Sequence, residues 1–248
     1  MRVESFAIRL RPRGNMEAVD LGVRLCQSTA PSVYRCYLAV ALPWIVLSLA
    51  TVEIASWLPS TLIWLAKPWF DRTILFVMSR AAFGESTTLR DVWREQRQVW
   101  WSQLFRTWTL QRLSMWRSLT QPVIQLEGLR GAQLRDRVKT IRAGKSRSAT
   151  YMTGAFSSVE NILWFSAISL VFWFAPEGHD FDLMQILIGE DETLWMSLAF
   201  ASVYSAVVLF VEPFYVAAGF ALYLNRRVEL EAWDIEQEFR RAFARKDS

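Results

Sequence analysis

The sequence is short of the residues on which most catalytic and metal sites depend. It has one histidine and two cysteines in 248 residues. It also lacks the GxSxG, HExxH and paired CxxC motifs and any glycine-rich nucleotide loop. The histidine, His179, lies in an acidic stretch with Glu177, Asp180 and Asp182 that could hold a metal, but such a stretch is more typical of an exposed, solvated loop. We therefore predict no enzyme activity, no catalytic residue, no metal and no cofactor.

The two cysteines do not form a recognisable pair. Cys26 and Cys36 are ten residues apart and outside any CxxC pattern, so we expect ordinary thiols on a reducing side of the membrane rather than a disulfide. The sequence "GKS" at 144–146 is not a phosphate loop, because that motif needs a glycine at position 139, where the chain has lysine. A cleavable signal peptide is not expected either, since residues 1–36 carry six arginines and no apolar core.

The chain is rich in long apolar runs. Hydrophobic residues make up 52% of it, its mean hydropathy is +0.15, and it has 13 tryptophans. Residues 38–58, 151–175 and 194–224 are each long enough to cross a bilayer core, which takes roughly 20 residues. A large soluble helical core is the alternative, but the run 194–224 has no polar face for water. These runs predict an all-α integral membrane protein.

Basic residues are distributed unevenly between the loops. Residues 82–150 hold 13 Lys/Arg against five Asp/Glu, whereas residues 176–193 hold six acids and no Lys or Arg. Because Lys and Arg collect on the cytoplasmic side, we expect both termini and residues 82–150 inside and residues 176–193 outside. The chain must then cross twice between the N-terminus and residue 82, which makes about four transmembrane segments.

This topology divides the chain into five regions. They are a cytoplasmic N-terminal segment (1–36), a first transmembrane hairpin (37–83), a basic, tryptophan-rich cytoplasmic helical region (84–150), a second transmembrane hairpin (151–224) with an acidic external loop (176–193), and a charged cytoplasmic helical tail (225–248).

The second leg of the first hairpin carries charges. Lys67, Asp71 and Arg72 surround Pro68, which removes a backbone donor and kinks a helix. We expect residues 60–83 to cross the membrane or to re-enter it, in preference to lying on its surface. Lys67 and Asp71 are four apart and can pair on one helix face, or Lys67 can extend towards the outer interface.

The basic region 84–150 predicts two amphipathic helices. Thr88 and Asp91 fit a capping box, and Trp101, Trp108 and Met115 recur every seven residues among arginines. Such a helix suits the headgroups of an anionic leaflet, and packing on other helices is an equal alternative; we do not expect nucleic-acid binding. A second helix is expected to follow, with Pro122 in its first turn and a loop at Gly144.

Carboxylates inside the apolar runs are candidates for function, because charge at bilayer depth is unfavourable. Glu53 lies near the outer end of its run and can reach water. Glu160 and Glu212 lie deeper, the second next to Pro213. They form either an ion-binding or coupling site, or a structural ion pair, which we favour, with Arg72 or Arg80 as the expected partner of Glu212. The intramembrane polar candidates are Lys67, Asp71, Arg72, Arg80, Glu160, Glu212 and Pro213.

Three blocks carry a family resemblance: "KPWFDRTILFVMSRAAFGE" (67–85), "LTQPVIQLEGLRG" (119–131) and "VEPFYVAAGFALYLNRRVELEAWDIEQEFRR" (211–241). They cover about a quarter of the chain and resemble a poorly characterised family of bacterial inner-membrane proteins. That family is similar to the membrane domain associated with some glycerophosphodiester phosphodiesterases and is often encoded near MoxR-type ATPases. The phosphodiesterase's catalytic barrel needs histidines and has no room here.

The resemblance implies an integral membrane component, with a cytoplasmic ATPase as one possible partner. Positions that match the family pattern are Lys67, Asp71, Arg72, Arg80, Glu127, Arg130, Glu212, Pro213, Asn225, Arg226, Arg227, Glu229, Trp233, Asp234 and Glu238. Those expected at the cytoplasmic face, as docking candidates, are Arg226, Arg227, Glu229, Trp233, Asp234 and Glu238.

Three functions compete on these grounds. The first is a non-enzymatic inner-membrane subunit or scaffold that assembles with itself or with other membrane and cytoplasmic partners in contact with anionic lipids. The second is a transporter or channel component that uses Glu160 and Glu212. The third, a membrane-embedded lipid enzyme, rests only on the carboxylates and tryptophans.

Overall fold

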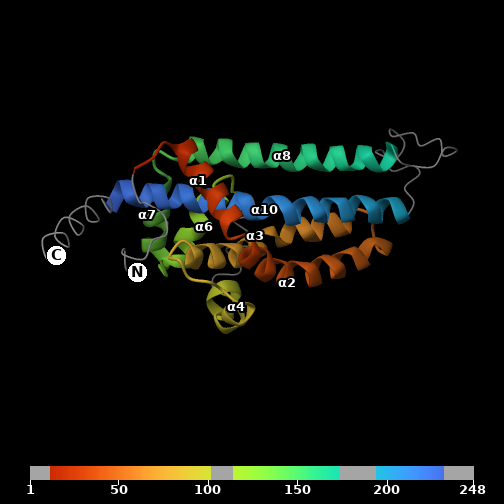
Figure 1. Cartoon of the computed structure of the whole chain (residues 1–248), viewed down its shortest axis with the longest axis horizontal. Helices are drawn as coiled ribbons and strands as arrows, with labels where there is room; N and C mark the ends of the chain where they lie inside the picture. Colours follow the sequence, from red (N-terminus) through yellow and green to blue (C-terminus); the bar gives the residue numbers. More distant parts are fainter. Residues whose placement is uncertain (1–11, 102–113, 174–193, 232–248) are drawn as a thin grey trace, which may run out of the picture.

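The fold is helical throughout the part of the chain that the computed structural model describes, residues 12–101, 114–173 and 194–231 (Figure 1). Its elements are α1 (Asn15–Ser28), α2 (Ala30–Leu49), the 3₁₀ turn η2 (Ala50–Glu53), α3 (Leu58–Ala81), α4 (Leu89–Arg94), the π-helical turn η3 (Arg97–Trp101), α6 (Arg117–Leu126), α7 (Gly131–Arg142), α8 (Ser146–Trp173) and α10 (Leu194–Glu231). The all-α prediction is confirmed for these residues.

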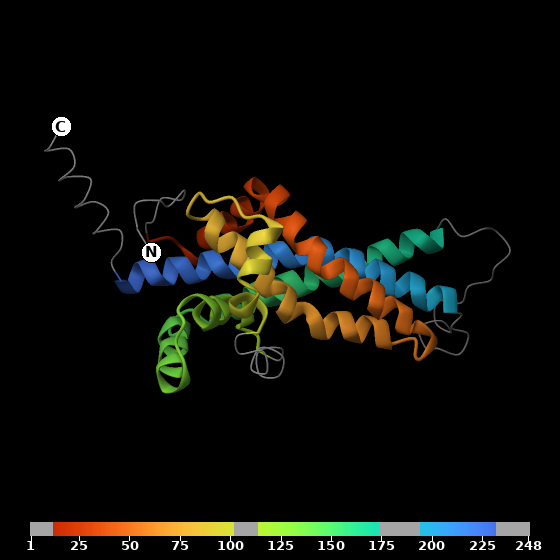
Figure 2. The same ribbon diagram turned by 90° about the horizontal axis from the view of Figure 1, so that it is seen from below.

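Two helical stretches in the described ranges are long and apolar enough to cross a membrane. They are 30–53, which joins α2 to η2, and α10. Four long helices, α2, α3, α8 and α10, run along the long axis of the molecule, and α6 and α7 gather near one end of it (Figures 1 and 2). The crossing of α3 and α8 remains part of the proposal below.

Helix α10 is the centre of the bundle. It packs against α1, α2, α3, α6 and α8. Two glycines permit the closest of these approaches: a Cβ at Gly22 of α1 would lie 2.4 Å from the carbonyl oxygen of Ala217, and one at Gly219 of α10 would lie 2.2 Å from Cβ of Ser118. The α1–α10 and α6–α10 contacts are therefore made nearly backbone to backbone, which leaves no space for a methyl group.

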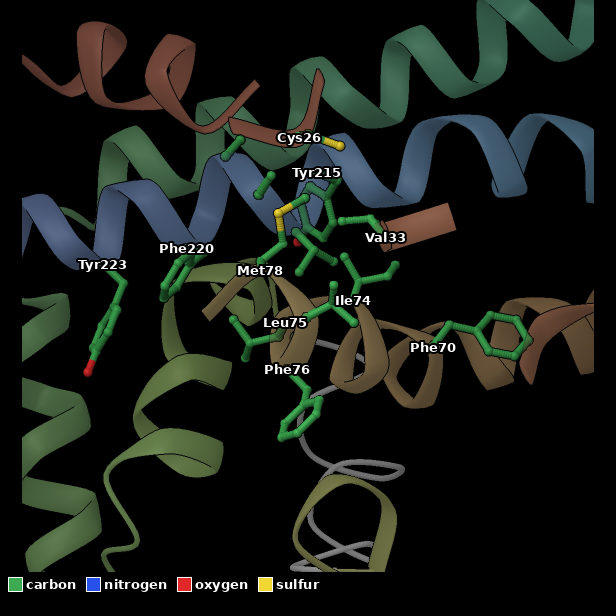
Figure 3. Close-up of a cluster of buried hydrophobic side chains, with 14 of the residues drawn as sticks. Cys26, Val33, Phe70, Ile74, Leu75, Phe76, Met78, Tyr215, Phe220 and Tyr223 are labelled. Carbon is green, nitrogen blue, oxygen red and sulfur yellow. The ribbon is translucent and has the colours of Figure 1, made fainter. Parts of the chain in front are cut away.

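The apolar core gathers where α1, α2, α3 and α10 meet (Figure 3). Successive residues of α3 are buried around most of its circumference, and Phe70, Ile74 and Met78 are fully enclosed. A helix that is apolar on all sides needs neighbours or lipid on all sides. Helix α3 has α2, α10, α6 and the turn η3 as its neighbours.

Both prolines of the charged segments lie inside continuous helices. Helix α3 runs through Pro68 and α10 runs through Pro213. Each proline lacks an N–H, so each leaves one carbonyl of the preceding turn without its helical hydrogen bond. Of residues 60–83, expected to cross or re-enter, all up to Ala81 belong to α3, which contacts α2 and α10.

The basic region differs from the two long amphipathic helices expected. The capping box is confirmed, because Asp91 accepts hydrogen bonds from the backbone N–H and the hydroxyl of Thr88, at 2.8 and 2.7 Å. Helix α4 nevertheless ends at Arg94, and the turn η3 directs Trp100 inwards, where its indole N–H donates to Thr73. Two members of the expected stripe, Trp101 and Met115, are exposed, and the third, Trp108, lies outside the described residues.

The second expected helix is also divided. Helix α6 ends at Leu126 and α7 begins at Gly131, and Gly128 and Gly131 have φ of 66° and 60° at the turn. Pro122 lies in the middle of α6 rather than in its first turn. All residues from Arg117 to Gln125 are buried, so α6 is an internal helix and not a surface one. The loop expected at Gly144 is present but short, since α8 begins at Ser146.

Candidate functional site: a buried ion-pair network and its cleft

The charges of α3 point to two sides of that helix. Lys67 and Asp71 are one turn apart and share a face, whereas Arg72 is rotated about 100° from Asp71. The side chains of all three are nearly inaccessible, with exposures of 5%, 1% and 1% for the residues. Arg72 donates from Nε to the carbonyl oxygen of Val99, towards η3. Arg72 therefore has a different set of partners from Lys67 and Asp71.

Five side chains from four helices form what we call the buried network. Its members are Lys67 and Asp71 of α3, Arg117 of α6, Glu160 of α8 and Glu212 of α10. The Lys67 ammonium lies 2.6 Å from Oε2 of Glu160 and 3.0 Å from Oε2 of Glu212. The Arg117 guanidinium lies 2.6 Å from Oε1 of Glu212 and 2.8 Å from Oδ2 of Asp71. Glu212 is thus the shared carboxylate between the two cations.

The structure brings together four of the intramembrane candidates but pairs them differently than expected. Glu212 meets Lys67 and Arg117, not the Arg72 or Arg80 expected from sequence, and Arg80 pairs with Glu85 at 3.1 Å. Lys67 and Asp71 do not pair along their helix but bind partners on other helices. Lys67 does not extend to the outer interface either, because its ammonium is buried between two glutamates.

Arg117 is the member that sequence reasoning missed. It was counted with the basic residues of the cytoplasmic region. Buried carboxylates need cationic partners, but Arg72 and Arg80 were available in the same span as Lys67, so nothing in the sequence singled out Arg117. The Arg117 guanidinium also lies over the ring of Tyr215, 5.2 Å from the centroid.

Helix α6 reinforces the network through its amides. The side-chain N–H groups of Gln121 and Gln125 donate to the backbone carbonyls of Pro68 and Arg72, at 3.4 and 2.8 Å. These contacts fix α6 along α3, on the stretch that carries Lys67 and Asp71. Arg117, one turn before Gln121, is then held facing both Asp71 and Glu212.

A cleft of about 390 Å³ opens beside the network, between α3 and α8. Four residues of the network line it and are here called its charged floor: Lys67, Arg117, Glu160 and Glu212. Its lining also includes Trp64, Ser114, Met115, Thr153, Phe156, Ser157, Val211 and Tyr215. Among the network members, Glu160 has the largest exposed side-chain fraction, 18%, against 3% for Glu212 and 1% for Asp71. The cleft therefore presents mainly the Glu160 carboxylate.

A second group of ion pairs, here called the terminal cluster, lies at the far end of α10. It consists of Glu127, Arg137, Lys145, Tyr223, Arg226, Arg227, Glu229 and Glu231. Arg137 bridges Glu127, at 2.7 Å, and Glu231. Lys145 and Arg226 both bind Glu229, at 2.6 and 3.1 Å.

The terminal cluster contains three of the docking candidates. All three are bound within the chain: Arg226 and Glu229 connect α10 to α7 and to the turn before α8, and Arg227 pairs with Glu231 within α10. The other three, Trp233, Asp234 and Glu238, lie outside the described residues. Two further positions of the family pattern belong here: Glu127 accepts from Tyr223 at 2.8 Å, and Asn225 exchanges hydrogen bonds with the backbone of Arg13.

The thiols are buried and unpaired with each other. Cys26 and Cys36 are both free, as expected, and burial raises the pKa of the Cys26 thiol to about 12, so it is unreactive at neutral pH. Within the described residues no group of three His, Cys, Asp or Glu side chains could hold a metal ion. His179 and its acidic neighbours lie outside those residues.

Comparison of the chain with family models, with curated proteins and with solved structures finds no match. The buried network and its cleft must therefore be interpreted from their own chemistry.

Proposed function

We propose that the protein is a non-enzymatic, multi-pass membrane subunit of the bacterial inner membrane, with both termini in the cytoplasm. Its four spans would be α2 with η2, α3, α8 and α10. The placement of α3 and α8 is supported by their alignment with α2 and α10 along one axis (Figure 1). It is also supported by exposed apolar side chains on α8, such as Ile162 at 63% and Phe165 at 55%, which water would disfavour.

The observation that carries the scaffold role is the buried network. In the described structure each of its charges is engaged by another member, from a different helix. Groups used in this way lock helix rotation and register. They are not arranged as a nucleophile with its base, which a lipid enzyme would need. A rigid helical body of this kind suits a subunit that presents surfaces to itself, to membrane partners or to a cytoplasmic ATPase.

Cysteine labelling in intact cells tests the membrane placement. Glu53→Cys, at the expected outer end, should react with a membrane-impermeant maleimide, whereas Arg135→Cys on α7 should react only after permeabilisation. Both residues are exposed, and the buried native thiols give little background. Labelling of Arg135→Cys from outside would overturn the topology.

A transporter or channel component is the second candidate, because the cleft adjoins Glu160, Glu212 and Lys67. The two candidates differ in proteoliposomes loaded with a pH-sensitive dye. A scaffold should leave an imposed proton gradient intact. The transporter would be favoured if the wild type dissipated the proton gradient and Glu212→Gln, while still folded, did not. Mass measurement of the particle in detergent then tells whether it is a monomer or an assembly.

A further inference from the structure

The cleft between α3 and α8 is a candidate binding site. Helix α8 packs on α10 and α6, and α3 packs on α2 and α10. Figure 1 shows α8 and α3 on opposite sides of α10, whose residues Val211, Glu212 and Tyr215 also line the cleft. The rim carries Trp64 and Met115, with exposures of 40% and 59%. A ligand with an apolar body and a polar head could place the head on the charged floor.

The hydrogen-bond capacity of the floor identifies the chemistry of that head. The three donors of Lys67 are occupied, two by Glu160 at 2.7 and 2.6 Å and one by Glu212 at 3.0 Å. Its ammonium cannot accept an added anion without losing a carboxylate. Each carboxylate, in contrast, offers about four lone-pair sites. Glu160 receives two hydrogen bonds from Lys67, so it retains acceptor capacity, and it lines the cleft.

Charge and ring chemistry favour the same kind of ligand. The network residues that line the cleft are two carboxylates, Glu160 and Glu212, and two cations, Lys67 and Arg117. Among these four, Glu160 has the most exposed side chain, so the charge most accessible to a ligand is negative. The rings of Trp64, Phe156 and Tyr215 line the cleft, and aromatic faces attract cations. An accessible carboxylate with spare acceptor capacity and aromatic walls together suit a cationic donor.

We propose that the cleft binds a primary ammonium group, which Glu160 accepts and the aromatic walls surround. Two sources supply that chemistry: an ethanolamine-type lipid headgroup, with acyl chains along Trp64 and Met115, or a soluble amine. If the ligand is a lipid, this inference rests on the membrane placement given in the proposed function; if it is a soluble amine, it does not. It does not depend on whether the subunit acts as a scaffold.

Native mass spectrometry of the purified full chain in maltoside detergent tests the proposal. The probes are phosphatidylethanolamine, phosphatidylcholine and phosphatidylglycerol with identical acyl chains. The wild type should bind one phosphatidylethanolamine about tenfold more tightly than phosphatidylcholine, whose choline group is cationic but has no N–H donor, as expected for a hydrogen bond to a charged group. Phosphatidylglycerol, which lacks the ammonium, should bind no better than phosphatidylcholine. Equal binding of all three lipids would overturn the proposal.

Three variants locate the site. Glu160→Gln should abolish the preference for phosphatidylethanolamine, whereas Glu53→Gln, a matched loss of charge at the exposed end of η2, should retain it. Trp64→Leu removes a ring at the rim and leaves every charged residue of the buried network in place, so it serves if Glu160→Gln fails to fold. It should weaken the binding of phosphatidylethanolamine about threefold. A preference that survives Glu160→Gln, or binding that Trp64→Leu leaves unchanged, would contradict the assignment.

A competition experiment with a soluble amine distinguishes the two sources of the ammonium group. Free ethanolamine is titrated against the phosphatidylethanolamine complex. Displacement at concentrations close to those of the lipid indicates a soluble amine as the ligand, and displacement only at far higher concentrations indicates the lipid. Because binding is measured in detergent, a failed labelling experiment with intact binding would disprove the topology but not the site.

Discussion

The buried network and the terminal cluster use the same chemistry in different surroundings. In the buried network the side chains of Asp71 and Glu212 are 1% and 3% exposed. In the terminal cluster Arg137 and Glu229 are 23% and 25% exposed. Water reaches the second group and can replace a lost partner, but it has little access to the first. We therefore expect the energetic consequence of breaking a pair to depend on its depth much more than on its distances.

The buried network also differs in its connectivity. Its five members come from α3, α6, α8 and α10, so one altered residue releases charges on several helices. The terminal cluster connects the end of α10 to neighbouring segments, and several of its pairs, such as Arg227 with Glu231, lie within one helix. The buried network therefore fixes how the helices of the bundle are arranged, whereas the terminal cluster stabilises one end of the bundle.

The largest effect is expected from removing one partner in the buried network. Arg117→Gln and Glu212→Gln should each destabilise the fold by roughly 3–5 kcal/mol, because the remaining charge is left buried and uncompensated. The double variant should lose less than the sum of the two. Chemical unfolding in detergent measures all three free energies. Strictly additive losses would mean that the two groups do not interact, and the contrast between the two regions would fail.

The next effect concerns the close packing that presents Arg117 to the network. Gly219→Ala should destabilise by about 1–3 kcal/mol, because the new methyl group overlaps Ser118 and must displace α6. Gly154→Ala on α8 is the matched control, since a Cβ there meets nothing within 4 Å. It should be neutral or slightly stabilising, as alanine is the better helix former. Equal melting temperatures for the two variants would show that α6 is not tightly held against α10.

The parts of this architecture that could be predicted from sequence are local. The apolar runs predicted α2 and α10, and the capping box predicted the beginning of α4. Both features are determined by residues that are close together in the sequence. Lys67, Asp71, Glu160 and Glu212 were identified as charges in apolar surroundings. Their pairing was not, because Lys67 and Glu160 are 93 residues apart and their contact depends on how two helices are rotated.

The failed expectations have a common physical origin. Arg72 was considered as a partner of Glu212 from depth alone, but it is rotated away from the Asp71 face. Helix α6 was expected to be part of a longer cytoplasmic amphipathic helix. It is internal because Gly219 allows it to approach α10 and because its glutamines bond to α3. Such tertiary contacts leave no periodic pattern in the sequence.

A smaller effect is expected in the terminal cluster. Arg137→Gln should reduce stability by about 1 kcal/mol or less, because pairs that water can reach contribute little. The loss should shrink further as salt is raised towards 1 M, where the Debye length is about 3 Å, whereas the loss from Arg117→Gln should change little. Unfolding at two salt concentrations measures both. A salt-independent loss at Arg137 as large as that at Arg117 would remove the distinction between the two regions.

The smallest effect lies outside both groups, at the exposed capping box of α4. The N–H and hydroxyl of Thr88 donate to Asp91 and lower the pKa of its carboxyl below the usual value. A carboxyl with a lowered folded-state pKa stabilises the fold above its unfolded pKa and loses that contribution as pH falls through the folded pKa. Asp91→Asn should therefore speed hydrogen exchange in α4 at neutral pH, and its ratio to the wild type should approach one at acidic pH. Asp136→Asn, an exposed acid of α7, should leave exchange in α4 unchanged. A ratio that stays constant down to acidic pH would show that the Asp91 charge does not hold the cap. In that case the charges whose removal lowers stability would be those of the buried network, because water cannot replace their lost partners.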